Sequence, residues 1–221
     1  MKLVSFLLII VLYFILSQTS YNIFYPLSLF VAFLHELGHS IFSIITWWNV
    51  VSLDINANGS GLATTSWWFR SLVIMWWYIW SALFGSLLLF SSVKFERFTN
   101  YILKFFSLVL LYSSIFWFSD IMSSLIQIWL ALSLLWISYI NVKYSSFFLQ
   151  LIWVFSLIYI IKDFNVWPSS DLSKFSWLLP VIIWQYIWLW IVLIIFSLTI
   201  KITYFSSTSD KNDVYKIVLK K

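Results

Sequence analysis

The chain has 221 residues, of which 62% are hydrophobic and only 10% are charged. A soluble domain carries about a quarter charged residues, so this composition excludes an ordinary soluble fold and indicates a polytopic membrane protein. The net charge of +5 comes from loop and tail lysines, without a basic face interleaved with aromatic residues, which excludes nucleic acid as a partner. Cysteine is absent, so any metal ion must be held by nitrogen and oxygen ligands.

Apolar runs of membrane-spanning length recur along the chain, and they predict an all-α polytopic membrane protein with about seven (six to seven) transmembrane helices. The predicted spans are residues 3–17, 26–48, 67–90, 101–118, 121–140, 147–161 and 177–200. The first resembles a signal-peptide core, but no small-residue cleavage pattern follows it, so we expect a retained span. Ser119-Asp120 predicts a tight turn with a helix cap, and residues 141–146 predict a short loop.

A β-hairpin is predicted between the second and third spans. Val51, Leu53 and Ile55 alternate with polar residues, which is the periodicity of a strand. The turn-forming stretch 58–61 then leads into a second strand at residues 62–65. The sequence therefore predicts a short hairpin at the membrane face where the second span ends.

The second span contains His35-Glu36-Leu37-Gly38-His39, which includes both histidines of the chain. Residues i and i+4 share one face of a helix, so His35 and His39 can bind the same metal ion. Glu36 can accept a proton from water bound to that ion, as in the H-E-x-x-H arrangement of zinc hydrolases. A structural His–Glu pairing is the alternative, but ionisable groups inside a membrane span usually mark a function.

A catalytic zinc ion usually has three protein ligands, so a third ligand must come from elsewhere in the chain. The candidate carboxylates are Asp54, Asp120, Asp163 and Asp171, and those of Asp210 and Asp213 lie in a more remote tail. Asp120 has a simpler role as a helix cap, and Asp163 can neutralise Lys162. If the chain crosses the membrane at each span, the hairpin, Ser119-Asp120 and the 162–176 loop share one face, which lies nearer His39. Lys94 and Lys143 then face the opposite side.

The motifs resemble those of the M50 metallopeptidases, in particular the M50B-like branch related to site-2 proteases. The similar segments are 35–39, the hairpin residues 58–61 and 64–65, 80–85, Ser170-Asp171, Leu178-Leu179-Pro180 and Trp184. The resemblance implies a multi-span zinc protease fold and Asp171 as the third zinc ligand. Two features depart from the family: the Asp-Gly pair of the later helix is absent, and bulky Met75-Trp76-Trp77 replaces a small pair in the third span.

The expected protein is a zinc-dependent intramembrane or juxtamembrane peptidase, an integral multi-pass protein of the cell membrane. Residues 1–200 would form a single transmembrane metallopeptidase-like domain, and residues 201–221 a polar, lysine-bearing tail. His35, His39 and Asp171 would bind Zn²⁺, Glu36 would be the general base, and the partners would be the lipid bilayer and a membrane-embedded or membrane-anchored protein substrate. Gly38 would allow a neighbouring helix or the substrate to approach the metal-binding helix.

Two other functions are compatible with the metal motif. A catalytically inactive membrane scaffold or metal-handling protein would keep the ion but would not need Glu36 as a base. A transporter would need polar groups on several spans or helices broken within the membrane. Outside the motif the spans offer mainly serines and Gln127, Gln150 and Gln185, so the transporter has little support.

Overall fold

The structure is a computed structural model that describes residues 11, 25–66, 70–164 and 181–205. Its elements are α2 (Tyr25–Ile45), β1 (Val50–Ile55), β2 (Gly61–Thr65), α3 (Arg70–Lys94), the 3₁₀ helix η1 (Glu96–Phe98), α4 (Thr99–Phe116), α5 (Ile121–Ile140), α6 (Val142–Phe164), α7 (Val181–Ile200) and the π-helix η3 (Lys201–Phe205). The predicted first span lies outside the described residues, apart from Val11.

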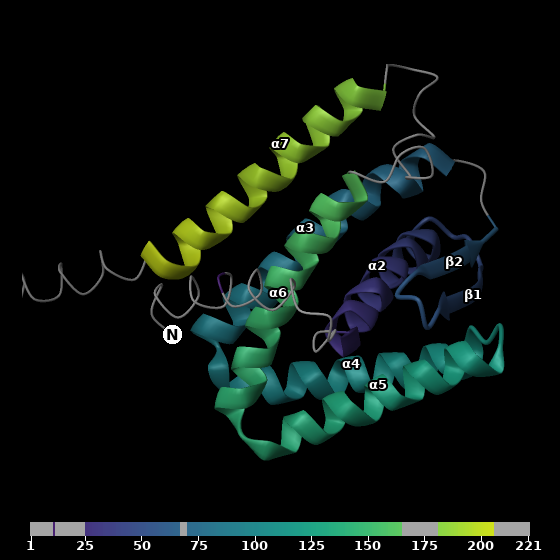
Figure 1. Cartoon of the computed structure of the whole chain (residues 1–221), viewed down its shortest axis with the longest axis horizontal. Coiled ribbons are helices and arrows are strands. Elements are labelled where there is room, and N and C mark those ends of the chain that lie inside the picture. The colour runs from purple at the N-terminus through teal and green to yellow at the C-terminus, as the bar shows by residue number, and fades with distance from the viewer. Residues whose placement is uncertain (1–10, 12–24, 67–69, 165–180, 206–221) are drawn as a thin grey trace, which may run out of the picture.

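Helix α2 is the central helix of the fold. It contacts α3, α6 and both strands, and Figure 1 shows it between the hairpin and the α3–α6 pair. In its most apolar 18-residue stretch, 67% of the residues are buried, against 39% in α5 and 28% in the α7 region. The H-E-x-x-H motif therefore lies inside the protein rather than on a lipid-facing surface.

Helices α4 and α5 pack against each other (Figure 1), and their exposed faces are apolar. On α4 the exposed large side chains recur every three or four residues: Tyr101, Phe105, Leu108, Tyr112 and Ile115. The buried faces of the same helices hold polar side chains: Ser107, Ser113 and Ser114 on α4, and Ser123, Ser124, Gln127 and Ser138 on α5. An apolar exterior around hydroxyl groups is the arrangement expected of helices surrounded by lipid.

The membrane-protein prediction is confirmed in a coarse form. Four described helical segments are long and apolar enough to cross a membrane: 25–45, 96–116, 121–140 and 186–203. Shorter apolar helices cover 82–94 and 142–157. These segments indicate a mostly helical integral membrane protein with a small two-stranded sheet. The count of seven spans stays a prediction.

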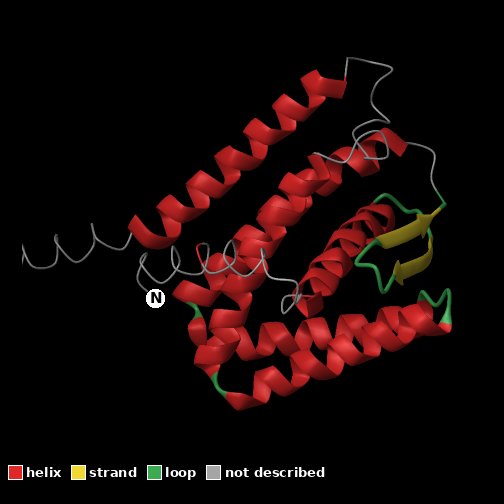
Figure 2. Cartoon of the chain, viewed as in Figure 1, coloured by secondary structure: helices red, strands yellow, loops and turns green. Residues whose placement is uncertain are grey.

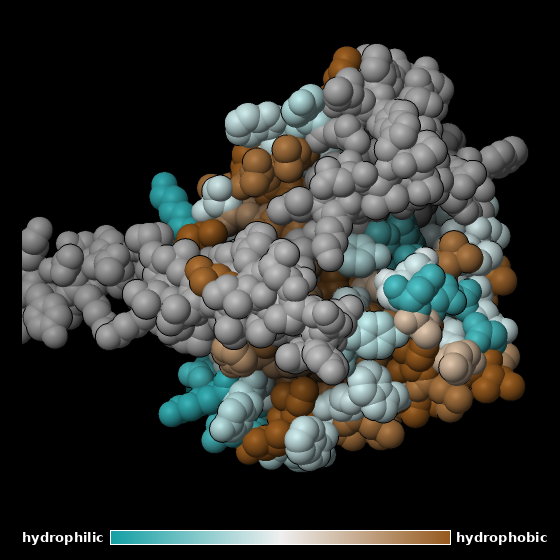
Figure 3. Space-filling view, viewed as in Figure 1, coloured by the Kyte–Doolittle hydropathy of each residue, from teal (hydrophilic) through white to brown (hydrophobic). Residues whose placement is uncertain are grey.

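The connections gather at two ends of the molecule. The hairpin and the α4–α5 turn lie together, and the Leu53 N–H donates to the carbonyl of Trp117 at 3.1 Å. At the other end, the hydroxyl of Thr99 at the start of α4 lies 3.4 Å from the carbonyl of Val142 at the start of α6. On the face seen in Figure 3, hydrophilic side chains gather at the lower left edge and at the right, and hydrophobic ones cover much of the lower surface between them.

The hairpin prediction is confirmed. Strands β1 and β2 pair antiparallel, with Leu53 opposite Ala63 and Ile55 opposite Gly61, and form the only sheet in the part of the chain that the structure describes (Figure 2). Gly59 in the turn has φ of 87°, a left-handed conformation that glycine adopts without strain. The phenol of Tyr25 donates to the carbonyl of Ala57, which ties the first turn of α2 to the hairpin turn.

Several predicted boundaries are wrong. Helix α3 continues to Lys94 rather than ending near Phe90, and α6 continues to Phe164, through the start of the predicted 162–176 loop. Two further differences have a visible cause. Helix α2 ends at Ile45 rather than near Trp48, because Trp47 takes a left-handed φ of 63° and stops the helix. Residues 142–146 are not a loop but the first turn of α6, which begins directly after Asn141. The polar residues there fit a helix because Ser146 is buried and its hydroxyl donates to the carbonyl of Ser92 at 2.7 Å.

A buried polar network fixes strand β1 to the end of the α4–α5 pair. Gln127 donates from Nε2 to the carbonyl of Leu53 at 2.8 Å, and its Oε1 accepts a hydrogen bond from Ser113. The Ile55 N–H donates to the Ser123 hydroxyl at 2.8 Å. Together with the Leu53–Trp117 bond, these contacts satisfy the edge of β1 that faces away from β2. The hairpin is thereby held at main-chain atoms, in addition to the buried side chains of Leu53 and Ile55.

We expect the substitution Gln127→Leu to lower the free energy of unfolding by about 1–3 kcal/mol, because it leaves the buried Leu53 carbonyl without its donor. Thermal unfolding of the purified protein in detergent measures the change. The matched control is Ser133→Ala, which removes only a bond to the carbonyl of Trp129 within α5 and should stay within about 0.5 kcal/mol of the parent. A Gln127→Leu protein as stable as the parent would show that the network does not stabilise the fold.

Candidate metal centre

His35 and His39 lie on the same face of α2, one turn apart. Their ring centroids are 5.2 Å apart with the ring planes inclined at 60°. His35 is buried and His39 is half-buried. Two imidazoles in this arrangement provide two nitrogen ligands from one rigid helix, so the backbone need not rearrange to bring them together.

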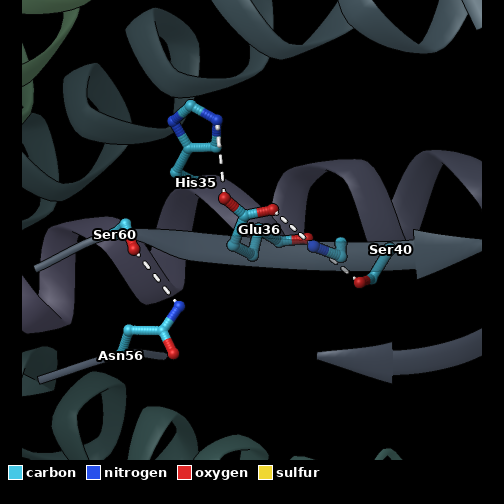
Figure 4. Close-up of polar contacts among 6 residues, drawn as sticks. His35, Glu36, Ser40, Asn56 and Ser60 are labelled. Carbon is cyan, nitrogen blue, oxygen red and sulfur yellow. Dashed lines mark hydrogen bonds and ion pairs between the residues drawn. The ribbon is translucent and has the colours of Figure 1, made fainter. Parts of the chain in front are cut away.

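Glu36 turns its carboxylate toward both His35 and the hairpin. Its Oε1 lies 3.8 Å from Nε2 of His35, and its Oε2 accepts a hydrogen bond of 2.8 Å from the Ala63 N–H of strand β2. Figure 4 shows these contacts together with the 3.0 Å bond from the Ser40 hydroxyl to the main-chain carbonyl of Glu36. Glu36 is buried, with a relative exposure of only 6%.

The donor set fits a zinc ion. One ligand atom from each of His35, Glu36 and His39 can be chosen so that all three lie within 4.8 Å of one another, and no other described His, Asp or Glu belongs to this group. Two nitrogens that bind one tetrahedral zinc ion lie about 3.4 Å apart, given zinc–nitrogen distances of about 2.0–2.1 Å. Small side-chain rotations therefore suffice for the two imidazoles to share an ion. Imidazole nitrogen is also a ligand type that zinc prefers.

Helix α3 approaches α2 at Gly38. A Cβ atom added there would lie 2.4 Å from Cδ1 of Trp80, so any larger residue would force the indole away. The prediction that Gly38 allows close approach of a neighbouring helix is confirmed, and that helix is α3. The contact is made at Trp80, about one turn beyond residues 75–77, which depart from the family pattern.

Helix α6 forms another wall of the site. The ring of Tyr159 contacts the ring of His35 edge-on, with centroids 5.4 Å apart and planes inclined at 73°. Sequence reasoning did not find Tyr159, because it is one of several aromatic residues in an apolar helix and no spacing connects it to the motif. It also missed the Ala63 N–H, because this main-chain group can donate to Glu36 only when the hairpin packs against α2.

The structure separates the four candidate carboxylates. Asp120 caps α5, where its Oδ1 accepts from the Ser123 N–H at 2.9 Å, so the predicted capping role is confirmed. Asp54 lies in β1; burial raises the pKa of its carboxyl, a hydrogen bond with Ser52 opposes that rise, and the charge of Asp120 adds to it. Asp163 lies in the last turn of α6, and Asp171 lies outside the described residues. Neither Asp54 nor Asp120 belongs to the His35–Glu36–His39 group.

Comparison with known proteins gives one result. The family profile described as Peptidase M50B-like matches residues 6–201. No curated protein and no solved structure matches the chain significantly. Because the match spans most of the 221 residues, including the helix that carries His35, Glu36 and His39, the chain belongs to the peptidase M50B-like family.

Proposed function

We propose that the chain is a zinc-dependent endopeptidase of the membrane that cleaves membrane-embedded or membrane-anchored protein substrates. The observation that carries the proposal is the grouping of His35, Glu36 and His39 inside a helix of membrane-spanning length. Membership of the M50B-like family supports the same reaction. We further propose a multi-pass protein of the cell membrane, with Asp171 as the third zinc ligand.

The proposed roles follow from the positions of the side chains. Zinc, when bound, lowers the pKa of a coordinated water and polarises the scissile carbonyl. His35 and His39 would hold the ion through their ring nitrogens. Glu36 would take the proton of the attacking water on Oε1, which faces His35, and would pass it to the leaving amine. Trp80 and Tyr159 line the site and would limit the space around the scissile bond.

The hairpin provides a polar surface beside the proposed site. Peptide hydrolysis needs water, which the hydrocarbon interior excludes, so water must reach the site through a polar region. Strand β2 contacts Glu36 directly and continues into Thr64 and Thr65. Glu36 lies near the middle of α2, so the polar main chain and threonines of the hairpin beside it would help water to reach a scissile bond there.

We expect the purified chain to bind about one zinc ion, because two histidines one turn apart supply half of a tetrahedral site. His35→Ala and His39→Ala should each abolish stoichiometric zinc, measured by elemental analysis after dialysis. Ser133→Ala, on the far side of α5, is the matched control and should keep the ion. Full zinc retention by both histidine variants would contradict the proposed site.

Glu36→Gln should keep zinc and lose hydrolysis. Glutamine retains an oxygen that can accept the Ala63 N–H but cannot take a proton from water, and loss of a general base lowers a rate by about 10²–10⁴-fold. Cleavage is measured in proteoliposomes with a panel of single-span reporter proteins, using a reporter that the parent cleaves. A variant that cleaves at the parental rate would exclude Glu36 as the base. A zinc-loaded parent that cleaves no reporter would favour the scaffold or metal-handling alternative.

Asp171→Asn should weaken zinc affinity by roughly 10–100-fold or more, since loss of even an outer-shell partner has an effect of that size. Three observations support Asp171: the site needs a third protein ligand, Asp120 serves as a helix cap, and neither Asp54 nor Asp120 joins the metal group. Asp120→Asn and Asp163→Asn are the matched controls and should keep near-normal zinc affinity in a competition titration. An essential Asp120 with a dispensable Asp171 would overturn the ligand assignment but not the zinc site.

A further inference from the structure

Strand β2 meets the proposed catalytic base at a distance that only glycine permits. A Cβ atom added to Gly61 would lie 2.5 Å from Cγ and 2.8 Å from Oε1 of Glu36. Both distances are shorter than real Cβ contacts allow. Two residues further along the same strand, the Ala63 N–H donates to Oε2 of Glu36. The strand therefore contacts Glu36 at its stem and at its carboxylate.

The two carboxylate oxygens of Glu36 consequently have different surroundings. Oε2 is fixed by the main chain of β2, while Oε1 lies 3.8 Å from Nε2 of His35. A glutamate side chain in water rotates freely about three bonds, and an active site must restrict it to one productive geometry. Here the restriction comes from a main-chain donor, whose position does not depend on a side-chain rotamer.

Strand β2, which contacts Glu36, is fixed in place through the β1 residues that pair with Ala63 and Gly61. Ala63 pairs with Leu53, whose N–H and carbonyl are bound by Trp117 and Gln127. Gly61 pairs with Ile55, whose N–H is bound by Ser123. In an antiparallel pair, the N–H and carbonyl of one residue point to the same side of the ladder. The main-chain groups of Leu53 and Ile55 that point away from β2 therefore face α4 and α5. Ala63 is paired with Leu53, so its N–H points away from β1, toward Glu36.

We propose that Gly61 and Ala63 are positioning residues for Glu36, the proposed base. Because Gly61 has no side chain, Glu36 can lie directly against strand β2. The hydrogen bond from the Ala63 N–H to Oε2 then orients the other oxygen, Oε1, toward His35 and the proposed zinc ion. This inference rests on the proposed hydrolysis for its catalytic part. Neither residue touches the reacting atoms, so both act through Glu36. Position 61 therefore requires glycine because of the contact with Glu36, and not only because it follows the hairpin turn.

The contact is tested without any substrate by a double-mutant cycle on the full-length protein in detergent. Gly61→Ala should lower Tm by roughly 2–10 °C in the parent, the range expected from overpacking. In the Glu36→Ala background, where Cγ and the carboxylate are gone, the same change should lower Tm by much less. Gly59→Ala is the matched control, because it strains the same hairpin at a positive φ with nothing within 4 Å. It should lower Tm equally in both backgrounds.

The positioning role is tested by kinetics with the reporter that the parent cleaves. Ala63→Pro removes the N–H that points away from β1, so the ladder stays intact, while Ala63→Gly keeps the N–H. Ala63→Pro should keep its zinc and its KM and lose roughly 10–100-fold in kcat, as a misplaced catalytic group does. Ala63→Gly should keep most of kcat. If Ala63→Pro folds poorly, Gly61→Ala gives the same split between kcat and KM.

Each outcome decides one claim. Equal effects of Gly61→Ala on Tm with and without Glu36 would overturn the contact, even if the parent cleaves its reporter. Parental kcat in both Gly61→Ala and Ala63→Pro would overturn the positioning role while leaving the proposed function intact. A parent that binds zinc but cleaves nothing would defeat the proposed function and the catalytic part of this inference, and the thermal cycle would still judge the contact.

Discussion

The structure depends on the requirement that a carboxylate buried among apolar helices must have hydrogen-bond donors. Burying an ionised group without partners costs far more than a single contact recovers. Glu36 meets this requirement through the Ala63 N–H. A helix cannot supply that donor, since its interior N–H groups are already bonded within the helix. Within the part of the chain that the structure describes, strand β2 supplies such a main-chain donor to Glu36.

The same requirement explains the composition of the α4–α5 pair. Its inward serines and Gln127 bond carbonyls and β1, while its outward side chains are apolar and aromatic. In lipid, burial of apolar surface does not drive helices together, so packing and hydrogen bonds between helices carry more of the association. The serine-rich interior is thus the structural counterpart of the unusual sequence, in which few residues are charged but many carry hydroxyl groups.

The sequence predicted the elements whose cause is local. Helix α5 has the predicted bounds because Asp120 caps it at one end and Asn141 interrupts it at the other. The hairpin follows from strand alternation and its turn, and the shared helix face of His35 and His39 follows from their i, i+4 spacing. Prediction failed at α6, where a polar stretch is helical because Ser146 bonds across to α3, a contact that no local pattern encodes.

In the candidate site, too, the sequence predicted the residues related by local spacing and not those brought in by packing. Spacing identified His35, Glu36 and His39, because all three belong to one helical turn. The contributions of Ala63, Trp80 and Tyr159 were not predictable, because each depends on how a distant element packs against α2. Asp171 remains a prediction from family resemblance and from the number of ligands that zinc requires.

The attachment of β1 to α5 also sets an order of assembly during synthesis. The bonds that fix β1 join residues 68 and 74 positions apart in sequence, from Ile55 to Ser123 and from Leu53 to Gln127. A growing chain that has released α2 and the hairpin still lacks α5, and its hairpin edge has no partners there. The proposed base thus gains its full support only after more than half of the polypeptide has been made. Incomplete chains would carry His35, Glu36 and His39 before the contacts that hold the hairpin against Glu36 can form.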